Sequence, residues 1–73
     1  MKYRTEIRNS NRSWTGEGHT PLISFMSARK EAELEKRRYT VIILAIDDCE
    51  IFRAQGMSPK SAYQSFRDNL RKI

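Results

Sequence analysis

The sequence predicts an α+β domain, in which an N-terminal antiparallel β-ribbon precedes a long helix and a shorter C-terminal helix. Three observations favour this layout. Residues 2–8 alternate between charged and apolar side chains, as a half-buried strand does. Residues 22–55 contain no Gly or Pro, and residues 58–72 place apolar side chains at helical spacing behind a Ser-Pro start. At 73 residues the chain is expected to form a single domain, residues 1–73, with a small core.

The β-ribbon is expected within residues 2–26, with two or three short strands. In the stretch KYRTEIR, charged residues line one face and the other face holds Tyr3, Thr5 and Ile7. The Asn-Ser-Asn triplet that follows favours a turn, after which RSWTGEGH returns antiparallel with Trp14 over the apolar face. Two glycines weaken this second strand, and LISFM, directly after Pro21, is a candidate third strand.

One long helix is expected over residues 27–55. Ser27 is a good N-cap, and the residues after it, ARKEAELEKRR, are strong helix formers. The run YTVIILAI leaves a choice open. Its β-branched residues suit a buried strand over residues 40–46, whereas the absence of a helix breaker favours a continuous helix. On a helix, one apolar stripe would hold Val41, Ile42, Ala45, Cys49 and Phe52. We favour the helix and keep the strand as the alternative.

The C-terminal helix is expected over residues 58–72. Gly56 ends the preceding element, Ser58 is the N-cap, and Pro59 takes the first helical position, where its missing N–H costs nothing. Helical spacing then continues through Ala62, Tyr63, Phe66, Leu70 and Ile73. We find no internal repeat, linker or low-complexity tract in the sequence.

Composition points to a basic protein without a membrane span. Fourteen Lys and Arg against nine Asp and Glu give a formal net charge of +5, which favours polyanionic partners, nucleic acid first. The longest apolar run, residues 41–46, is far shorter than the roughly 20 residues that cross a bilayer. The N-terminus has no apolar stretch typical of a secretory signal. We therefore expect a cytoplasmic protein whose single cysteine, Cys49, stays reduced.

Residues 50–70 include the stretch GMSPKSAYQSF, which resembles the turn and recognition helix of TetR-type helix-turn-helix repressors. In that family a glycine, a small apolar residue and a serine cap precede an apolar residue, a tyrosine and a phenylalanine. The matching residues here are Gly56, Met57, Ser58, Ala62, Tyr63 and Phe66. The chain departs from the family at Phe52, where a small residue is usual, and at Ala62, where a larger aliphatic residue is usual. The resemblance implies a helix that enters the major groove of double-stranded DNA.

In such a helix, the first turns point toward base edges and the later turns toward phosphates. Gln bonds adenine on two atoms and Lys reaches guanine, so the candidate base-contacting residues are Lys60, Ser61 and Gln64. The candidate backbone contacts are Arg67, Arg71 and Lys72. An ordinary helical hairpin, with no role in DNA binding, is the alternative interpretation. A secondary candidate surface lies on the ribbon, where Trp14 could stack on a base beside Arg4, Arg8 and Arg12.

No enzymatic activity, metal or cofactor is expected. His19 and Cys49 are too few to hold zinc, and no nucleophile is fixed beside His19. On a helix, Asp47, Asp48 and Glu50 would point in different directions, which suits surface charge better than acid–base chemistry.

The leading hypothesis is a small nucleic-acid-binding or regulatory accessory protein of phage, plasmid or bacterial type. It would form a homodimer, because a core this small usually needs further support. The alternative is an adaptor or inhibitor that binds a host protein, or itself, through the apolar flank of residues 41–52 and the helix that carries Tyr63 and Phe66.

Overall fold

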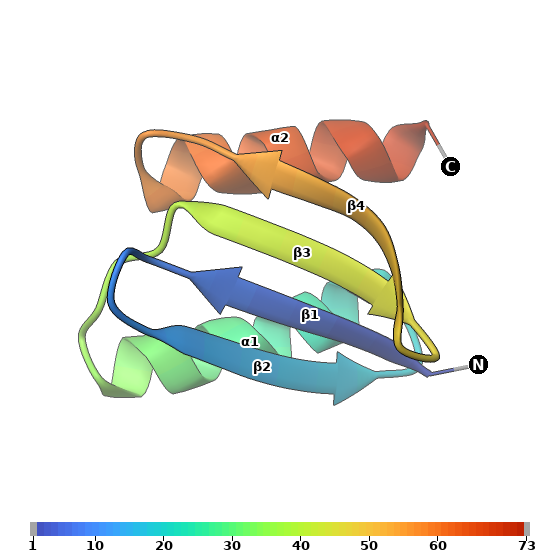
Figure 1. The fold of residues 1–73 in the computed structure, drawn as a ribbon, viewed down its shortest axis with the longest axis horizontal. Coiled ribbons are helices and arrows are strands. Elements are labelled where there is room, and N and C mark those ends of the chain that lie inside the picture. Colours follow the sequence, from blue (N-terminus) through green and yellow to red (C-terminus); the bar gives the residue numbers. More distant parts are fainter. Residues whose placement is uncertain (1, 73) are drawn as a thin grey trace.

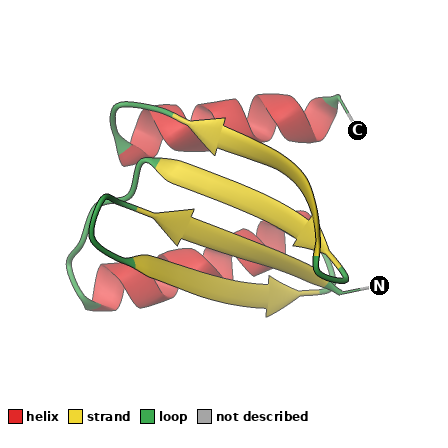
Figure 2. Ribbon diagram, in the orientation of Figure 1, coloured by secondary structure: helices red, strands yellow, loops and turns green. Residues whose placement is uncertain are grey.

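The computed structural model describes residues 2–72 and shows one four-stranded antiparallel sheet with two helices on the same face (Figures 1 and 2). The order along the chain is β-β-α-β-β-α, and the strand order across the sheet is β2-β1-β3-β4. The elements are β1 (Tyr3–Arg8), β2 (Ser13–Gly18), α1 (Pro21–Leu34), β3 (Val41–Ile46), β4 (Cys49–Gln55) and α2 (Pro59–Arg71). Helix α1 packs on β1 and β2, and α2 packs on β4 and β3.

The predicted layout of a ribbon, a long helix and a shorter helix is therefore wrong. The expected helix over residues 27–55 is divided among the end of α1, a connection and the strands β3 and β4. Residues 40–46, for which a strand was the alternative, include β3, which lies in the middle of the sheet. The C-terminal helix is formed as α2, while Ile73 lies outside the described residues.

Helix α1 begins six residues earlier than Ser27, the predicted cap, because Thr20 caps it. The Thr20 side chain accepts a hydrogen bond from the Ile23 N–H at 3.1 Å, and Pro21 follows at the first helical position. The stretch LISFM is thus the first turn and a half of a helix rather than a third strand. This start brings Ser24 and Phe25 into the core, where both are essentially inaccessible to solvent.

The break after α1 needs neither glycine nor proline, and it is made at Lys36. This residue adopts the left-handed region with φ 55°, which non-glycine residues seldom do. The Lys36 N–H bonds the Glu33 carbonyl and the Arg37 N–H bonds the Ala32 carbonyl, at 3.0 and 3.1 Å. These two bonds and the left-handed residue make a Schellman-type helix end. The absence of a breaker in the sequence was therefore a misleading signal.

The hairpin between β3 and β4 turns on two aspartates. Asp47 and Asp48 have φ values of 49° and 69°, and they separate the paired residues Ile46 and Cys49. Two consecutive left-handed residues are what a two-residue type I′ hairpin turn requires. A β-bulge between Leu44 and Ala45 shifts the pairing register between β3 and β4.

The core lies between the sheet and the two helices. Strand β1 supplies Thr5 and Ile7 to this core. The Thr5 and Ser24 hydroxyls form a hydrogen bond of 2.6 Å, so both of these buried polar groups have a partner. Aromatic rings join the two helices, because Phe25 stacks on Tyr63 and Phe66 with centroids 5.0 and 5.1 Å apart. The core cluster of buried residues comprises Ile7, Trp14, Phe25, Ala28, Ala32, Tyr39, Ile42, Leu44, Ala54, Ala62 and Phe66.

The fold consists of two ββα units related by an approximate two-fold axis normal to the sheet. The central strands β1 and β3 run antiparallel, each unit places its second strand at an edge, and the two helices run in opposite directions behind the sheet (Figure 1). The sequence carries a matching motif at constant spacing. Gly18, Thr20, Pro21, Phe25, Ser27 and Arg29 correspond to Gly56, Ser58, Pro59, Tyr63, Ser65 and Arg67. The strand-to-helix motif is thus repeated in the sequence.

Candidate nucleic-acid interface

Positive charge is distributed unevenly between the two faces of the molecule. Residues 29–38 and 60–72 together carry the whole formal net charge of +5, because the rest of the chain holds equal numbers of acidic and basic side chains. These two segments are the end of α1 with its connection to β3, and helix α2 with its last residues. The helix face is therefore the basic face, and the strands contribute no net charge.

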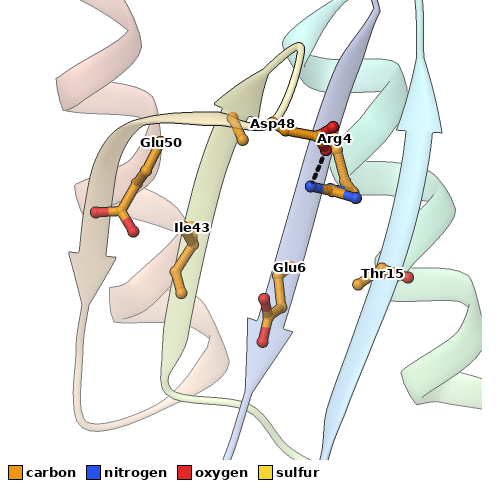
Figure 3. Close-up of a pocket in the computed structure, with 7 residues that line it drawn as sticks. Arg4, Glu6, Thr15, Ile43, Asp48 and Glu50 are labelled. Atoms are coloured by element: carbon orange, nitrogen blue, oxygen red, sulfur yellow. Dashed lines mark hydrogen bonds and ion pairs between the residues drawn. The ribbon is translucent and has the colours of Figure 1, made fainter.

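The open face of the sheet is covered by ion-paired side chains. A cavity of about 360 Å³ lies on this face, with walls from all four strands and the β3–β4 turn (Figure 3). Arg4 reaches across it to pair with Asp48, and Glu6 pairs with Arg8 at 2.5 Å. Every cation here has an acidic neighbour, so this face offers no concentrated field to a polyanion.

The ion pairs also shield the apolar strand beneath them. Ile43 points to the open face, yet only 6 % of it is exposed, because Glu6 and Arg53 flank it in the sheet register. The aliphatic stems of such long side chains can cover apolar surface while their charges stay in water. Arg53 donates to both carboxylate oxygens of Glu50 at 3.0 Å, and this hydrogen bond holds the pKa of Glu50 below its usual value.

The four secondary candidates on the ribbon are all engaged within the protein. Arg4 and Arg8 pair with acidic side chains on the open face, and Arg12 pairs with Glu35 at 2.5 Å. Trp14 is 6 % exposed and lies in the core, where its indole N–H donates to Glu35. A base cannot stack on Trp14 in this arrangement.

Helix α2 presents a continuous polar stripe to solvent. Lys60, Gln64, Arg67 and Arg71 fall at positions i, i+4, i+7 and i+11, which places them in one line along the helix. All four are exposed, as are Ser61 and Lys72 beside them. Within residues 2–72 none of the stripe's three cations forms a salt bridge. The Arg67 guanidinium lies 5.8 Å from the centre of the Tyr63 ring, which restrains it over the helix surface.

Ser61 differs from its neighbours, because its hydroxyl is part of the helix cap. The Ser58 N–H donates to the Ser61 hydroxyl at 3.0 Å, and the Ser61 N–H donates to the Ser58 hydroxyl at 3.3 Å. This reciprocal pair is a capping box. A contact from Ser61 to a base edge would compete with the cap, whereas Lys60 and Gln64 make no such internal bond within the described part of the chain.

A cavity that we call the Tyr39 notch lies where the end of α1 meets the start of α2. It measures about 350 Å³ and is lined by Arg29, Glu33, Arg37, Tyr39, Pro59, Lys60 and Tyr63. Arg29 is paired with Glu33 at 2.9 Å, while Arg37 and Lys60 have no salt bridge within residues 2–72. Burial raises the pKa of Tyr39, so its hydroxyl stays protonated.

The acidic cluster and the cysteine lie in the hairpin of β3 and β4. Asp47 and Asp48 form the β3–β4 turn, Glu50 pairs with Arg53, and Cys49 is exposed. No hydrogen bond joins Cys49 to His19 among the described residues. In the same part of the chain, no three His, Cys, Asp or Glu side chains come close enough together to hold a metal ion.

Comparison with protein-family models, curated proteins and solved structures finds no match for this chain. Neither helix within residues 2–72 is long and apolar enough to cross a membrane. The interpretation of the surface therefore depends on its own geometry and charge.

Sequence reasoning identified the residues of the α2 stripe but not the Tyr39 notch. Arg37 and Tyr39 fall inside the long helix predicted over residues 27–55, and nothing in that prediction brings them close to Lys60. In the structure, the left-handed turn at Lys36 directs them toward Lys60. The repeated Gly-x-Thr/Ser-Pro motif is the signal that could have revealed this arrangement, because it marks two equivalent strand-to-helix connections.

Proposed function

We propose that this chain is a small nucleic-acid-binding protein that contacts double-stranded DNA through α2. The observation that carries the proposal is the exposed stripe of Lys60, Gln64, Arg67 and Arg71, set against a sheet face whose charges are paired. The major groove admits an α-helix, and a glutamine and basic side chains on one line suit base edges and flanking phosphates. A regulatory or accessory role in the cytoplasm of a bacterium, for a phage or plasmid, completes the proposal.

The mode of DNA contact differs from that implied by the helix-turn-helix resemblance. The residues before Gly56 form strand β4, so α2 follows a strand and no helix crosses the DNA backbone in front of it. Phe52 and Ala62, the two departures from that family, face the core of a sheet-and-helix domain. The stripe would instead contact DNA from a helix that packs on β4 and β3.

The first test is a titration of mixed-sequence duplex DNA, followed by fluorescence anisotropy at two salt concentrations. Affinity should fall steeply as salt rises, because each neutralised phosphate releases a counterion. Arg67→Ala should weaken binding and lower the slope of log K against log salt by about 1. Gln64→Ala should weaken binding with no change of slope.

The matched control is Arg53→Ala, which removes the same charge from the paired sheet face. It should leave both the affinity and the slope nearly unchanged. Absence of binding at low salt, or equal losses in Arg67→Ala and Arg53→Ala, would rule out the α2 stripe as the interface.

A second candidate function, a protein-interaction adaptor, is favoured by exposed apolar residues on α1. Leu22, Ile23 and Met26 are 45 %, 51 % and 56 % exposed and lie on neighbouring turns. The surface differs from the one expected from the sequence, since Ile42, Leu44 and Phe66 are fully buried. The partner in this proposal is a host protein or a second copy of the chain.

A further inference from the structure

The Tyr39 hydroxyl has an unusual environment. Only 7 % of Tyr39 is exposed, and its ring packs edge-on against Phe25 with centroids 6.2 Å apart. Residues 2–72 form no hydrogen bond with the Tyr39 hydroxyl. In this part of the chain every fully buried side-chain N or O atom has a hydrogen-bond partner, so the Tyr39 hydroxyl oxygen is not fully buried. Its oxygen must therefore reach the surface, and the space it reaches is the Tyr39 notch. The packed ring thus holds a hydroxyl donor beside a cavity in which none of residues 2–72 accepts its hydrogen bond.

The charges around this hydroxyl select an anion. Three cations and one carboxylate line the notch, and the carboxylate, Glu33, is already paired with Arg29. Arg37 and Lys60 remain, one from each wall of the notch. The start of α2 adds a partial positive charge. Its capping box satisfies the Ser61 N–H, so in the first turn only the Lys60 N–H lacks a partner among residues 2–72.

We infer that the Tyr39 notch binds a phosphate group, with the Tyr39 hydroxyl as a fixed donor and Arg37 and Lys60 as the neutralising cations. The inference deepens the proposed function and rests on it, because Lys60 belongs to both the notch and the α2 stripe. A phosphate of the DNA backbone held at the start of α2 would set the register of Gln64 and Arg67 over the groove. The notch is thus a positioning site rather than a base-reading one.

The direct test uses inorganic phosphate and amide chemical shifts of the whole protein. Titration with phosphate, against chloride at equal ionic strength, should shift the amides of Arg37, Tyr39 and Lys60. Tyr39→Phe should reduce phosphate affinity roughly tenfold, the size expected for a lost hydrogen bond to a charged group. The urea midpoint should not change, because the hydroxyl forms no hydrogen bond with any of residues 2–72. Tyr3→Phe, on β1, is the matched control and should behave like the parent chain.

Duplex DNA with hydroxyl ends, and the same duplex with 5′-phosphates, distinguishes a backbone phosphate from a terminal one. The inference expects Tyr39→Phe and Arg37→Ala to weaken binding of the hydroxyl-ended duplex. If the two substitutions weaken binding of the 5′-phosphorylated duplex only, the notch binds a terminal phosphate and not a phosphate of the DNA backbone.

The outcomes also separate this inference from the proposed function. Loss of DNA binding in Arg67→Ala, with full binding in Tyr39→Phe and Arg37→Ala, would overturn the notch and leave the α2 interface intact. Specific phosphate binding in the notch without any duplex binding would retain the anion site and refute the DNA proposal. Amide chemical-shift changes that are the same in phosphate and in chloride would refute the phosphate site in the notch.

Discussion

At the residue scale, three residues other than glycine adopt the left-handed backbone conformation. Lys36, Asp47 and Asp48 all have positive φ, and each stands at a point where the chain reverses direction. Aspartate tolerates this region through its short polar side chain, whereas lysine has no such compensation. The strain at Lys36 is offset by the two hydrogen bonds that close α1 and by the core contacts of Tyr39 just beyond it.

Lys36→Gly is therefore expected to stabilise the protein by about 0.5 to 1 kcal/mol, because glycine adopts positive φ without a steric penalty. Lys30→Gly removes the same charge from the exposed middle of α1 and should destabilise by about 1 kcal/mol. Urea unfolding followed by circular dichroism would measure both. A loss of stability in Lys36→Gly would show that the turn at this position is not what ends α1.

At the element scale, the close approach of α1 to β2 depends on a residue without a side chain. A Cβ on Gly16 would lie 2.3 Å from the Ala28 backbone nitrogen and 2.6 Å from the Ser24 carbonyl oxygen. These atoms belong to the helix backbone, so they cannot move aside without lifting α1 from the sheet. The glycines of the SWTGEG strand, which suggested a weak or irregular strand, are in fact the contact surface for a helix.

Gly16→Ala should consequently cost about 1 to 3 kcal/mol, the usual range for overpacking a filled core. Thr15→Ala, on the opposite face of the same strand, is exposed and should change stability by less than about 0.5 kcal/mol. Both values follow from denaturant midpoints at constant m-value. Equal stability of the two variants would contradict the tight packing of α1 on β2.

At the scale of the whole molecule, the two ββα units have the same framework but different surfaces. The positions of Lys60 and Gln64 on α2 correspond to Leu22 and Met26 on α1. One helix thus exposes polar side chains where its counterpart exposes apolar ones. We propose that the α2 face meets nucleic acid, whereas the α1 face suits a second copy of the chain, as expected for a domain with so small a core.

Sedimentation at about tens of micromolar should then show a species larger than the 8.6 kDa monomer. Met26→Glu should restore the monomer, because a charge would be buried in the contact. Met57→Glu is the control: Met57 is 98 % exposed on the connection to α2 and should leave the assembly unchanged. A parent chain that sediments only as a monomer would exclude the dimer in this range.

The sequence by itself determined the local elements whose signals are short-range. Three signals are of this kind: the alternation of residues 2–8, the turn at Asn9 and the Ser58-Pro59 start of α2. Each signal spans only a few residues and specifies its element through its own hydrogen bonds or pattern. The exposed stripe of α2 could be predicted for the same reason, since a capped helix fixes which side chains share a line.

Only the tertiary structure decided between helix and strand for residues 40–46. Their apolar run suits a helix or a strand equally well in isolation, and β1 decides the matter by pairing with β3 through residues far apart in the chain. The Tyr39 notch followed from the same decision, because the turn at Lys36 brings Arg37 and Tyr39 beside Lys60. Long-range pairing and burial made the choice that local propensity left open, and a single sequence does not display either of them.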